Sequence, residues 1–530
     1  MNIIKNSNLV QAFKDPTLKL RPMDQYKAFL YLDVFLIVVN IPLFFYMLYM
    51  EMVVEMPMEA FQTVYVINSG LFILISAFRF QFGFVLWGIS LAAFQYFAFS
   101  LAYYPNIEFS RMHSDLVYTY NNISIVLATV SLNQSLMIIL SVLFGRKKIN
   151  SHKEYEIVQG LVIRKWMPVI IIVATIVMAL SVKGHLITSM PYPSPPPSYA
   201  ILRNNFGSIT TLAAVFLLVL VAFLAVQYRE KEPIKYWGIY IYIVMLISWG
   251  VYFRGNRSGA VMGFAGLALV EALFSNRKLV VKVLFLAISA VTIFILMEVM
   301  GFARLATYHI GLVESLQIGL NNELFGPSAN LGGDDFNPQH ITLFPHMFWI
   351  FLQCVNFYHT GIDMGGISFY NLILQVIPRF IADAIGYTRP VSGPILFGQY
   401  GFSQGGIQTV GEGYWNWGVW GAMLVQILIT GPAIYFENYA AKRNRMFLAG
   451  NIAYGGSSAF TLFYGLQALS KTVLFVLLFN WAFAKVYRWA SKNALIDYYL
   501  DTLRRKKIAE RRAEEAESLE GAPPEPAGSS

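Results

Sequence analysis

Long apolar runs recur along this chain of 530 residues and leave few folds open to it. A helix needs roughly 20 apolar residues to cross the hydrocarbon core of a bilayer, which is about 30 Å thick. Inside lipid the backbone must satisfy its own hydrogen bonds, so such runs form helices. The runs predict about twelve membrane spans, at 28–50, 60–78, 82–103, 120–144, 166–186, 206–226, 236–253, 258–274, 279–299, 413–436, 447–467 and 472–488. The sequence therefore predicts an all-α polytopic integral membrane protein.

Few residues carry charge, and the basic ones are scattered. Charged residues make up 13% of the chain and hydrophobic residues 56%, whereas about a quarter of a soluble domain is charged. The net charge of +9 comes from Lys and Arg distributed between apolar runs. That distribution orients a membrane protein, so no nucleic-acid partner is expected. The single cysteine, Cys354, excludes a disulfide within this chain and a thiolate metal cluster.

The basic residues favour one side of the membrane. Most of the 39 Lys and Arg fall on the side that holds both termini. The other side holds Arg111, Lys183, Arg203, Arg254, Arg257, Arg304, Arg379, Arg389 and Lys471. Because basic residues concentrate in cytoplasmic loops, both termini are predicted to be cytoplasmic.

The spans and loops divide the chain into four regions. We expect an N-terminal transmembrane region of nine spans, a large outer loop, a C-terminal transmembrane region of three spans, and a charged cytoplasmic tail with a disordered end, at 1–299, 300–412, 413–488 and 489–530. From Leu503 the tail alternates basic and acidic blocks, which predicts a short solvated helix.

The stretch 341–358 lies inside the outer loop and is almost long enough to span the membrane. A crossing there would move the basic loop at Lys442, Arg443 and Arg445 to the outside. It is therefore interpreted as an interfacial or re-entrant helix.

Charges near a bilayer need partners or a task, so the outer arginines are informative. Arg254 and Arg257 lie in the tight turn FRGNRSG between two predicted spans. A guanidinium matches phosphate oxygens bidentately, and a helix N-terminus beside it adds a positive dipole. The turn is predicted to bind phosphate or pyrophosphate, with headgroup anchoring as the alternative. For Arg304 both roles stay open.

The segment from Ile377 to Gly421 carries the remaining candidates. Arg379 and Arg389 each adjoin a proline, which fixes the local backbone and the height of the guanidinium. Glu412, in GEGYWNWG, can serve as a general base or only complement a helix dipole. For at least two of the aromatic residues Tyr414, Trp415 and Trp417, an interfacial belt is favoured over sugar stacking.

Other polar groups of the outer loop complete the set. His340 and His346 flank the start of the 341–358 stretch and are candidates for a base near neutral pH. Asp334 and Asp335, in LGGDDFNPQH, can hold a divalent ion, but ordinary turn chemistry is favoured. No metal site and no cofactor are therefore expected.

Together, GNRSG before a span and IPRF…RP…GGIQTVGEGYWNWGVWG before a late span resemble the Wzy-type polymerases of bacterial surface polysaccharides, also called O-antigen or oligosaccharide repeat-unit polymerases. The resemblance covers roughly residues 250–436. It implies a GT-C-like glycosyltransferase in the bacterial inner membrane. Such an enzyme transfers a glycan from undecaprenyl pyrophosphate to the non-reducing end of a lipid-linked repeat unit at the periplasmic face. Its partners would be that lipid-linked oligosaccharide, membrane lipid, a chain-length regulator and a flippase.

Under this resemblance the candidates take roles. The predicted catalytic residues are Glu412, Arg257, Arg379 and His340, and the predicted pyrophosphate- or glycan-binding residues are Arg254, Arg304, Arg389 and Tyr414. Developing negative charge on a pyrophosphate leaving group needs cationic stabilisation, which arginines provide without a metal. The alternatives are an O-antigen ligase and a lipid-linked glycan transporter or flippase. A transporter more often places charges within its spans, which here are largely uncharged.

Overall fold

The protein is described by a computed structural model, which is mostly helical in the part that it describes. That part comprises mainly 22–53, 58–78, 120–145, 277–289, 343–362, 364–374, 379–387, 407–441, 465–474 and 502–513, with a few single residues and pairs between them. No β-strand occurs in these ranges.

Four long helices coincide with predicted spans. They are α3 (Pro22–Val53), α4 (Met58–Phe78), α6 (Tyr120–Phe144) and α18 (Thr409–Ala441). Helical residues also fall within the predicted spans 258–274, 279–299 and 472–488. The predicted spans 82–103, 166–186, 206–226 and 236–253 lie outside the described residues.

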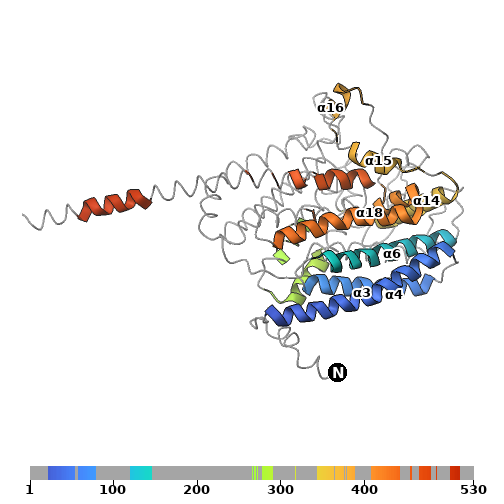
Figure 1. Cartoon of the computed structure of the whole chain (residues 1–530), viewed down its shortest axis with the longest axis horizontal. Helices are drawn as coiled ribbons and strands as arrows, with labels where there is room; N and C mark the ends of the chain where they lie inside the picture. Colours follow the sequence, from blue (N-terminus) through green and yellow to red (C-terminus); the bar gives the residue numbers. More distant parts are fainter. Residues whose placement is uncertain are drawn as a thin grey trace, which may run out of the picture. The chain divides into compact units, whose positions relative to one another are not determined.

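Helix α6 lies at the centre of this group (Figure 1). It contacts α3, α4, α18 and the shorter α14 (Leu343–His359). Every residue from 126 to 135 is buried, including polar ones such as Asn133 and Gln134. The apolar sequence of α6 is therefore explained by packing on several sides, not by one amphipathic face.

Two helices in the described part are long and apolar enough to cross a membrane. They contain the stretches Ile125–Phe144, of 20 residues, and Thr409–Asn438, of 30 residues. Helices α3 and α4 contribute shorter apolar stretches, Val34–Tyr49 and Ile67–Ala77.

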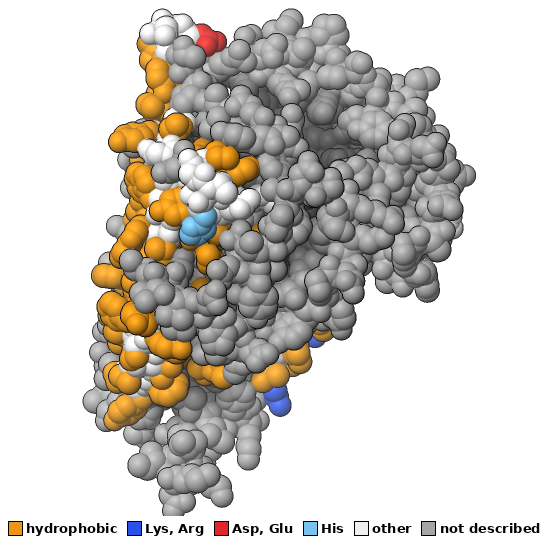
Figure 2. All heavy atoms as spheres, turned by 90° about the vertical axis from the view of Figure 1, so that its right-hand side faces the viewer, with side chains coloured by type: hydrophobic (Ala, Val, Ile, Leu, Met, Phe, Trp, Pro, Cys, Tyr) orange, Lys and Arg blue, Asp and Glu red, His pale blue; other side chains and the backbone are white. Residues whose placement is uncertain are grey.

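The outer side of this helix group is itself apolar. Figure 2 shows a continuous band of hydrophobic side chains along the described face. On α3 the exposed residues include Val34, Phe35, Val38, Phe45 and Tyr49. A soluble monomer rarely exposes so extended an apolar surface, so this band is suited to contact with lipid.

The predicted outer loop contains helices of its own. After α14 come α15 (Ile367–Leu374) and α16 (Arg379–Ala384). Residues 350–355 of α14 are all buried, and the helix contacts both α6 and α18. A helix lying in the headgroup plane would expose one side to solvent and another to lipid. Between the two predicted alternatives, burial on all sides favours the re-entrant helix over the interfacial one.

A second structural unit comprises 152–172 and 481–530. Its described residues include a helix at 502–513 in which every residue is exposed. The short solvated helix predicted after Leu503 is thereby confirmed.

Candidate functional site

The motif GEGYWNWG lies at a sharp break in α18. Trp417 has φ −143° and ψ 30°, and Gly418 has φ 59° and ψ −144°, which are not helical values. Gly418 occupies a backbone conformation that other residues rarely adopt. A Cβ at this position would also lie 2.8 Å from the Tyr358 ring. The element therefore consists of a short helix, 409–416, and a long helix, 419–441.

The short helix folds back on the long one. In a straight helix, Gly413 and Gly421 would be separated by about 12 Å along the axis. In the structure, a Cβ added to Gly413 would lie 2.6 Å from the Gly421 carbonyl oxygen and 2.6 Å from the Val425 side chain. Only residues without side chains allow this approach. The sequence predicts a single uninterrupted span at 413–436, without this reversal of the chain.

The short helix begins earlier than predicted because Gln408 caps it. The Gln408 side-chain oxygen accepts a hydrogen bond from the Gly411 amide at 2.5 Å, and its backbone oxygen accepts one from the Glu412 amide at 2.9 Å. The first contact satisfies an amide that a first helical turn otherwise leaves free, and the second is the first regular hydrogen bond of the helix. The boundary predicted between loop and span, at 412 and 413, thus falls inside a helix.

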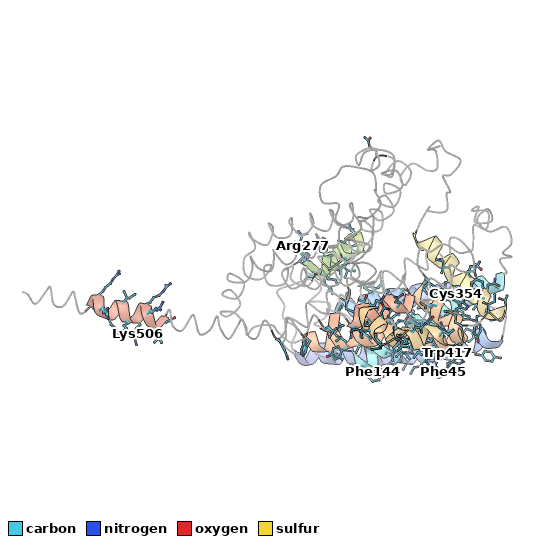
Figure 3. All side chains as sticks on the ribbon, turned by 90° about the horizontal axis from the view of Figure 1, so that it is seen from above. Phe45, Phe144, Arg277, Cys354, Trp417 and Lys506 are labelled. Carbon is cyan, nitrogen blue, oxygen red and sulfur yellow. The ribbon has the colours of Figure 1, made fainter. Side chains whose placement is uncertain are left out.

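Helix α14 forms one wall of the site. Gly411 lies directly on Phe351, since a Cβ there would be 2.8 Å from the ring. Trp415 lies 5.2 Å from Phe357 between ring centroids and donates from its indole N–H to the Ile362 oxygen at 2.5 Å. In Figure 3 the labelled Cys354 and Trp417 mark this region.

The three aromatic residues of the motif differ in exposure. Tyr414 and Trp415 are buried, so neither forms the interfacial belt that was the favoured interpretation. Trp417 is 41% exposed and stacks on Phe369 with 4.5 Å between ring centroids. Among the three, Trp417 alone presents a substantial surface to a ligand or to lipid.

Glu412 is held inside the protein. It is 2% exposed, and its carboxylate accepts a hydrogen bond from the Leu466 amide at 2.8 Å. The Ser368 hydroxyl faces both this carboxylate and the Met364 sulfur, and the carboxylate is the stronger acceptor. A Cβ on Gly465, at φ 78°, would lie 2.5 Å from the Glu412 oxygen, so a glycine is required there.

This geometry favours a structural role for Glu412. Leu466 lies in the first turn of helix 465–474, where backbone amides lack partners within the helix. The carboxylate caps that turn and complements the helix dipole. Gly465 has a positive φ of 78°, which interrupts helical geometry inside the predicted span 447–467. The buried carboxylate has almost no surface for an acceptor hydroxyl.

A second side chain of the short helix also holds a neighbouring element. Asn416 is fully buried; its oxygen accepts from the Ser368 amide at 3.1 Å and its nitrogen donates to the Glu412 backbone oxygen at 2.7 Å. Ser368 is in the first turn of α15, so Asn416 caps α15 as Glu412 caps helix 465–474. The sequence analysis did not single out Asn416.

The exposed side chain of the site is His359, which pairs with the buried Tyr414. The imidazole Nε2 and the phenol oxygen lie 3.3 Å apart. Around Tyr414 lie Tyr358, at 5.4 Å between ring centroids, and Phe351, at 6.5 Å. Helix α14 ends at His359 because Gly361, at φ 80°, turns the chain and Ile362 N–H donates to the Phe357 oxygen at 2.9 Å.

His359 is suited to accept a proton near neutral pH. Its side chain is exposed, but partial burial against the surrounding rings lowers the pKa of the imidazole below its usual value. The ring is therefore neutral at pH 7. The candidates predicted from the sequence were His340 and His346, although a histidine at the end of the helix before the motif was a usable signal.

The structure describes only some of the predicted site residues. Glu412 and Tyr414 belong to the short helix, where one contacts helix 465–474 and the other contacts α14. Arg379 is the first residue of α16, and its side chain is outside the described atoms. Arg254, Arg257, Arg304, His340 and Arg389 lie outside the described residues.

Comparisons with known proteins identify no relative of the chain. Among the described residues, no group of three His, Cys, Asp or Glu side chains can hold a metal ion. No protein-family model, curated protein or solved structure matches the chain.

Proposed function

We propose that the chain is a polysaccharide polymerase of the inner membrane that transfers a glycan from undecaprenyl pyrophosphate to a lipid-linked repeat unit. The observation that supports the proposal is the exposed His359, paired with the buried Tyr414 of the folded-back motif GEGYWNWG. It offers a neutral base at the position where the arginine-bearing loop enters a late span. Multiple spans, with both termini in the cytoplasm, are part of the proposal.

The proposed reaction is a displacement at the anomeric carbon. The acceptor hydroxyl forms the new glycosidic bond, the bond from that carbon to the pyrophosphate breaks, and the leaving group takes the electron pair. Arg254, Arg257, Arg304, Arg379 and Arg389 are the candidates for stabilising the negative charge that develops there. The acceptor proton goes to a base.

We assign the base role to His359. Glu412, the first candidate from the sequence, is buried and already accepts a backbone hydrogen bond. His359 is exposed, and the Tyr414 hydroxyl holds its ring through Nε2. In the tautomer whose Nε2–H donates to the Tyr414 oxygen, Nδ1 is the acceptor for the proton of the sugar hydroxyl.

The test is in vitro polymerisation. Purified protein in detergent receives undecaprenyl-pyrophosphate-linked repeat units and no nucleotide sugar, with or without a chelator. A ladder spaced by one repeat supports the polymerase. A single transfer that requires lipid A core identifies a ligase instead. Substrate that stays unchanged both without and with added lipid A core contradicts the proposal.

Buried polar groups in the spans favour a second candidate, a transporter of lipid-linked glycans. Gln134 donates to the Ser69 hydroxyl at 2.6 Å, and Asn68 donates to the Ser135 hydroxyl at 3.3 Å, across α4 and α6. The Asn133 amide is buried with neither its nitrogen nor its oxygen paired in the described structure. Such groups inside a span can face a polar pathway. Translocation of a fluorescent lipid-linked glycan in liposomes, lost in Asn133→Leu, would support this candidate.

A further inference from the structure

The helix at 502–513, with the sequence TLRRKKIAERRA, is strongly cationic. It carries six basic residues, Arg504, Arg505, Lys506, Lys507, Arg511 and Arg512, and one acidic residue, Glu510. Every residue of the helix is exposed. Figure 3 shows its side chains, Lys506 among them, standing out from the ribbon. These basic side chains therefore lie on the surface of the described helix.

The charges after Leu503 fall into blocks along the sequence. The run 504–507 comes first, Glu510, Arg511 and Arg512 follow, and the acidic residues Glu514, Glu515 and Glu517 come after them. The run 504–507 is therefore the densest group of positive charge in this part of the chain.

We propose that the basic run 504–507 binds anionic phospholipid headgroups of the membrane that the chain spans. Clusters of Lys and Arg just after a membrane span are attracted to an anionic leaflet. The helix follows the last predicted span, 472–488, on the side predicted to be cytoplasmic. Exposed Leu503 and Ile508 supply apolar contact within the headgroup region.

The acidic block does not cancel this attraction. In a helix, residues 504 and 514 are about 15 Å apart along the axis. The Debye length at physiological ionic strength is about 8 Å, so the two blocks act nearly independently. Anionic lipid therefore attracts the basic run near the membrane while the acidic block stays in solvent. This interaction is independent of the proposed polymerase activity.

Hydrogen exchange on the full chain tests the proposal. The protein is reconstituted, one copy per nanodisc, in phosphatidylcholine alone or with phosphatidylglycerol added. We expect backbone amides of 502–513 to exchange at least tenfold more slowly in the anionic nanodiscs. The difference should disappear in high salt, because the interaction is electrostatic.

Two charge variants make the outcome specific. R504Q/R505Q/K506Q/K507Q should exchange at equal rates in both lipids. The matched variant E514Q/E515Q/E517Q, which removes charges from the acidic block, should retain the difference. Equal exchange of the natural chain in both lipids, whether fast or slow, would overturn the proposal; slow exchange in both would indicate that the helix docks on protein.

Discussion

The Glu412 carboxylate and the Leu466 amide, 2.8 Å apart, connect two helices through one buried hydrogen bond. In Glu412→Ala the amide loses its partner, which should destabilise the protein by about 1–3 kcal/mol. Glu412→Gln keeps an acceptor oxygen, so its stability should be much closer to that of the natural protein. Thermal unfolding in detergent compares the two. An unchanged unfolding midpoint in Glu412→Ala would contradict the capping role. A Glu412→Gln variant that is stable but inactive would instead support a catalytic role for Glu412.

A second prediction at the residue scale concerns His359 and pH. Because burial lowers its pKa, the neutral base persists below the usual imidazole range. The acid limb of kcat/KM should therefore have its midpoint below about pH 6.5. His359→Gln should reduce kcat/KM by about a hundredfold or more and abolish that limb. The unfolding temperature serves as the control for folding. A natural-like profile in His359→Gln would exclude His359 as the base.

The sequence singled out the motif GEGYWNWG but not the partners of its residues. Glu412 and Tyr414 were predictable because charged and aromatic residues between glycines stand out in an apolar chain. Their contacts were not, because Glu412 reaches Leu466 and Asn416 reaches Ser368 across about fifty residues. Such pairs depend on how helices pack, and a single chain read locally does not contain that information.

At the scale of elements, the break in α18 makes a testable distinction between glycines. Gly413→Ala would place a methyl group against the Gly421 backbone and Val425, which cannot move aside without opening the fold. We expect a loss of several kcal/mol, as for overpacked cores, and little folded protein. Gly431→Ala meets nothing within 4 Å and should be neutral or stabilising by up to ~1 kcal/mol. Size-exclusion profiles of both variants measure the difference, and equal behaviour would contradict the fold-back.

Helix positions were predictable where hydropathy alone decides them. The ends of α6 match the predicted span 120–144, and α4 starts within a few residues of its prediction. The break at Gly418 was not predictable, because one more glycine in an apolar run looks like any other. The interruption at Gly465 was missed for the same reason. In both places a positive φ, set by neighbouring helices, decides the geometry.

At the scale of the whole molecule, the predicted topology assigns each loop to a side of the membrane. Ser194→Cys, in the predicted outer loop after 166–186, should react with an impermeant maleimide added to intact spheroplasts. Ser151→Cys, in the predicted inner loop after 120–144, should react only after permeabilisation. Native Cys354 is fully buried and should stay unlabelled, so no cysteine-free background is needed. Labelling of both variants from outside would overturn the orientation.

The helical character of the chain is confirmed in its described part, and the full number of spans stays a prediction. Composition sufficed to predict the helical character because apolar runs of this length have few alternatives in lipid. The arrangement of the arginines around a common site depends on residues that the structure does not describe.

The break in α18 also bears on how the protein matches its bilayer. A continuous helix over Thr409–Ala441, 33 residues, would be about 50 Å long, well beyond a hydrocarbon core of about 30 Å. Such a mismatch forces a helix to tilt or the bilayer to thicken. Because eight residues fold back, the remaining helix, 419–441, has a length close to the thickness of an ordinary membrane. A segment that hydropathy measures as too long can thus reside in a bilayer of normal thickness without deforming it.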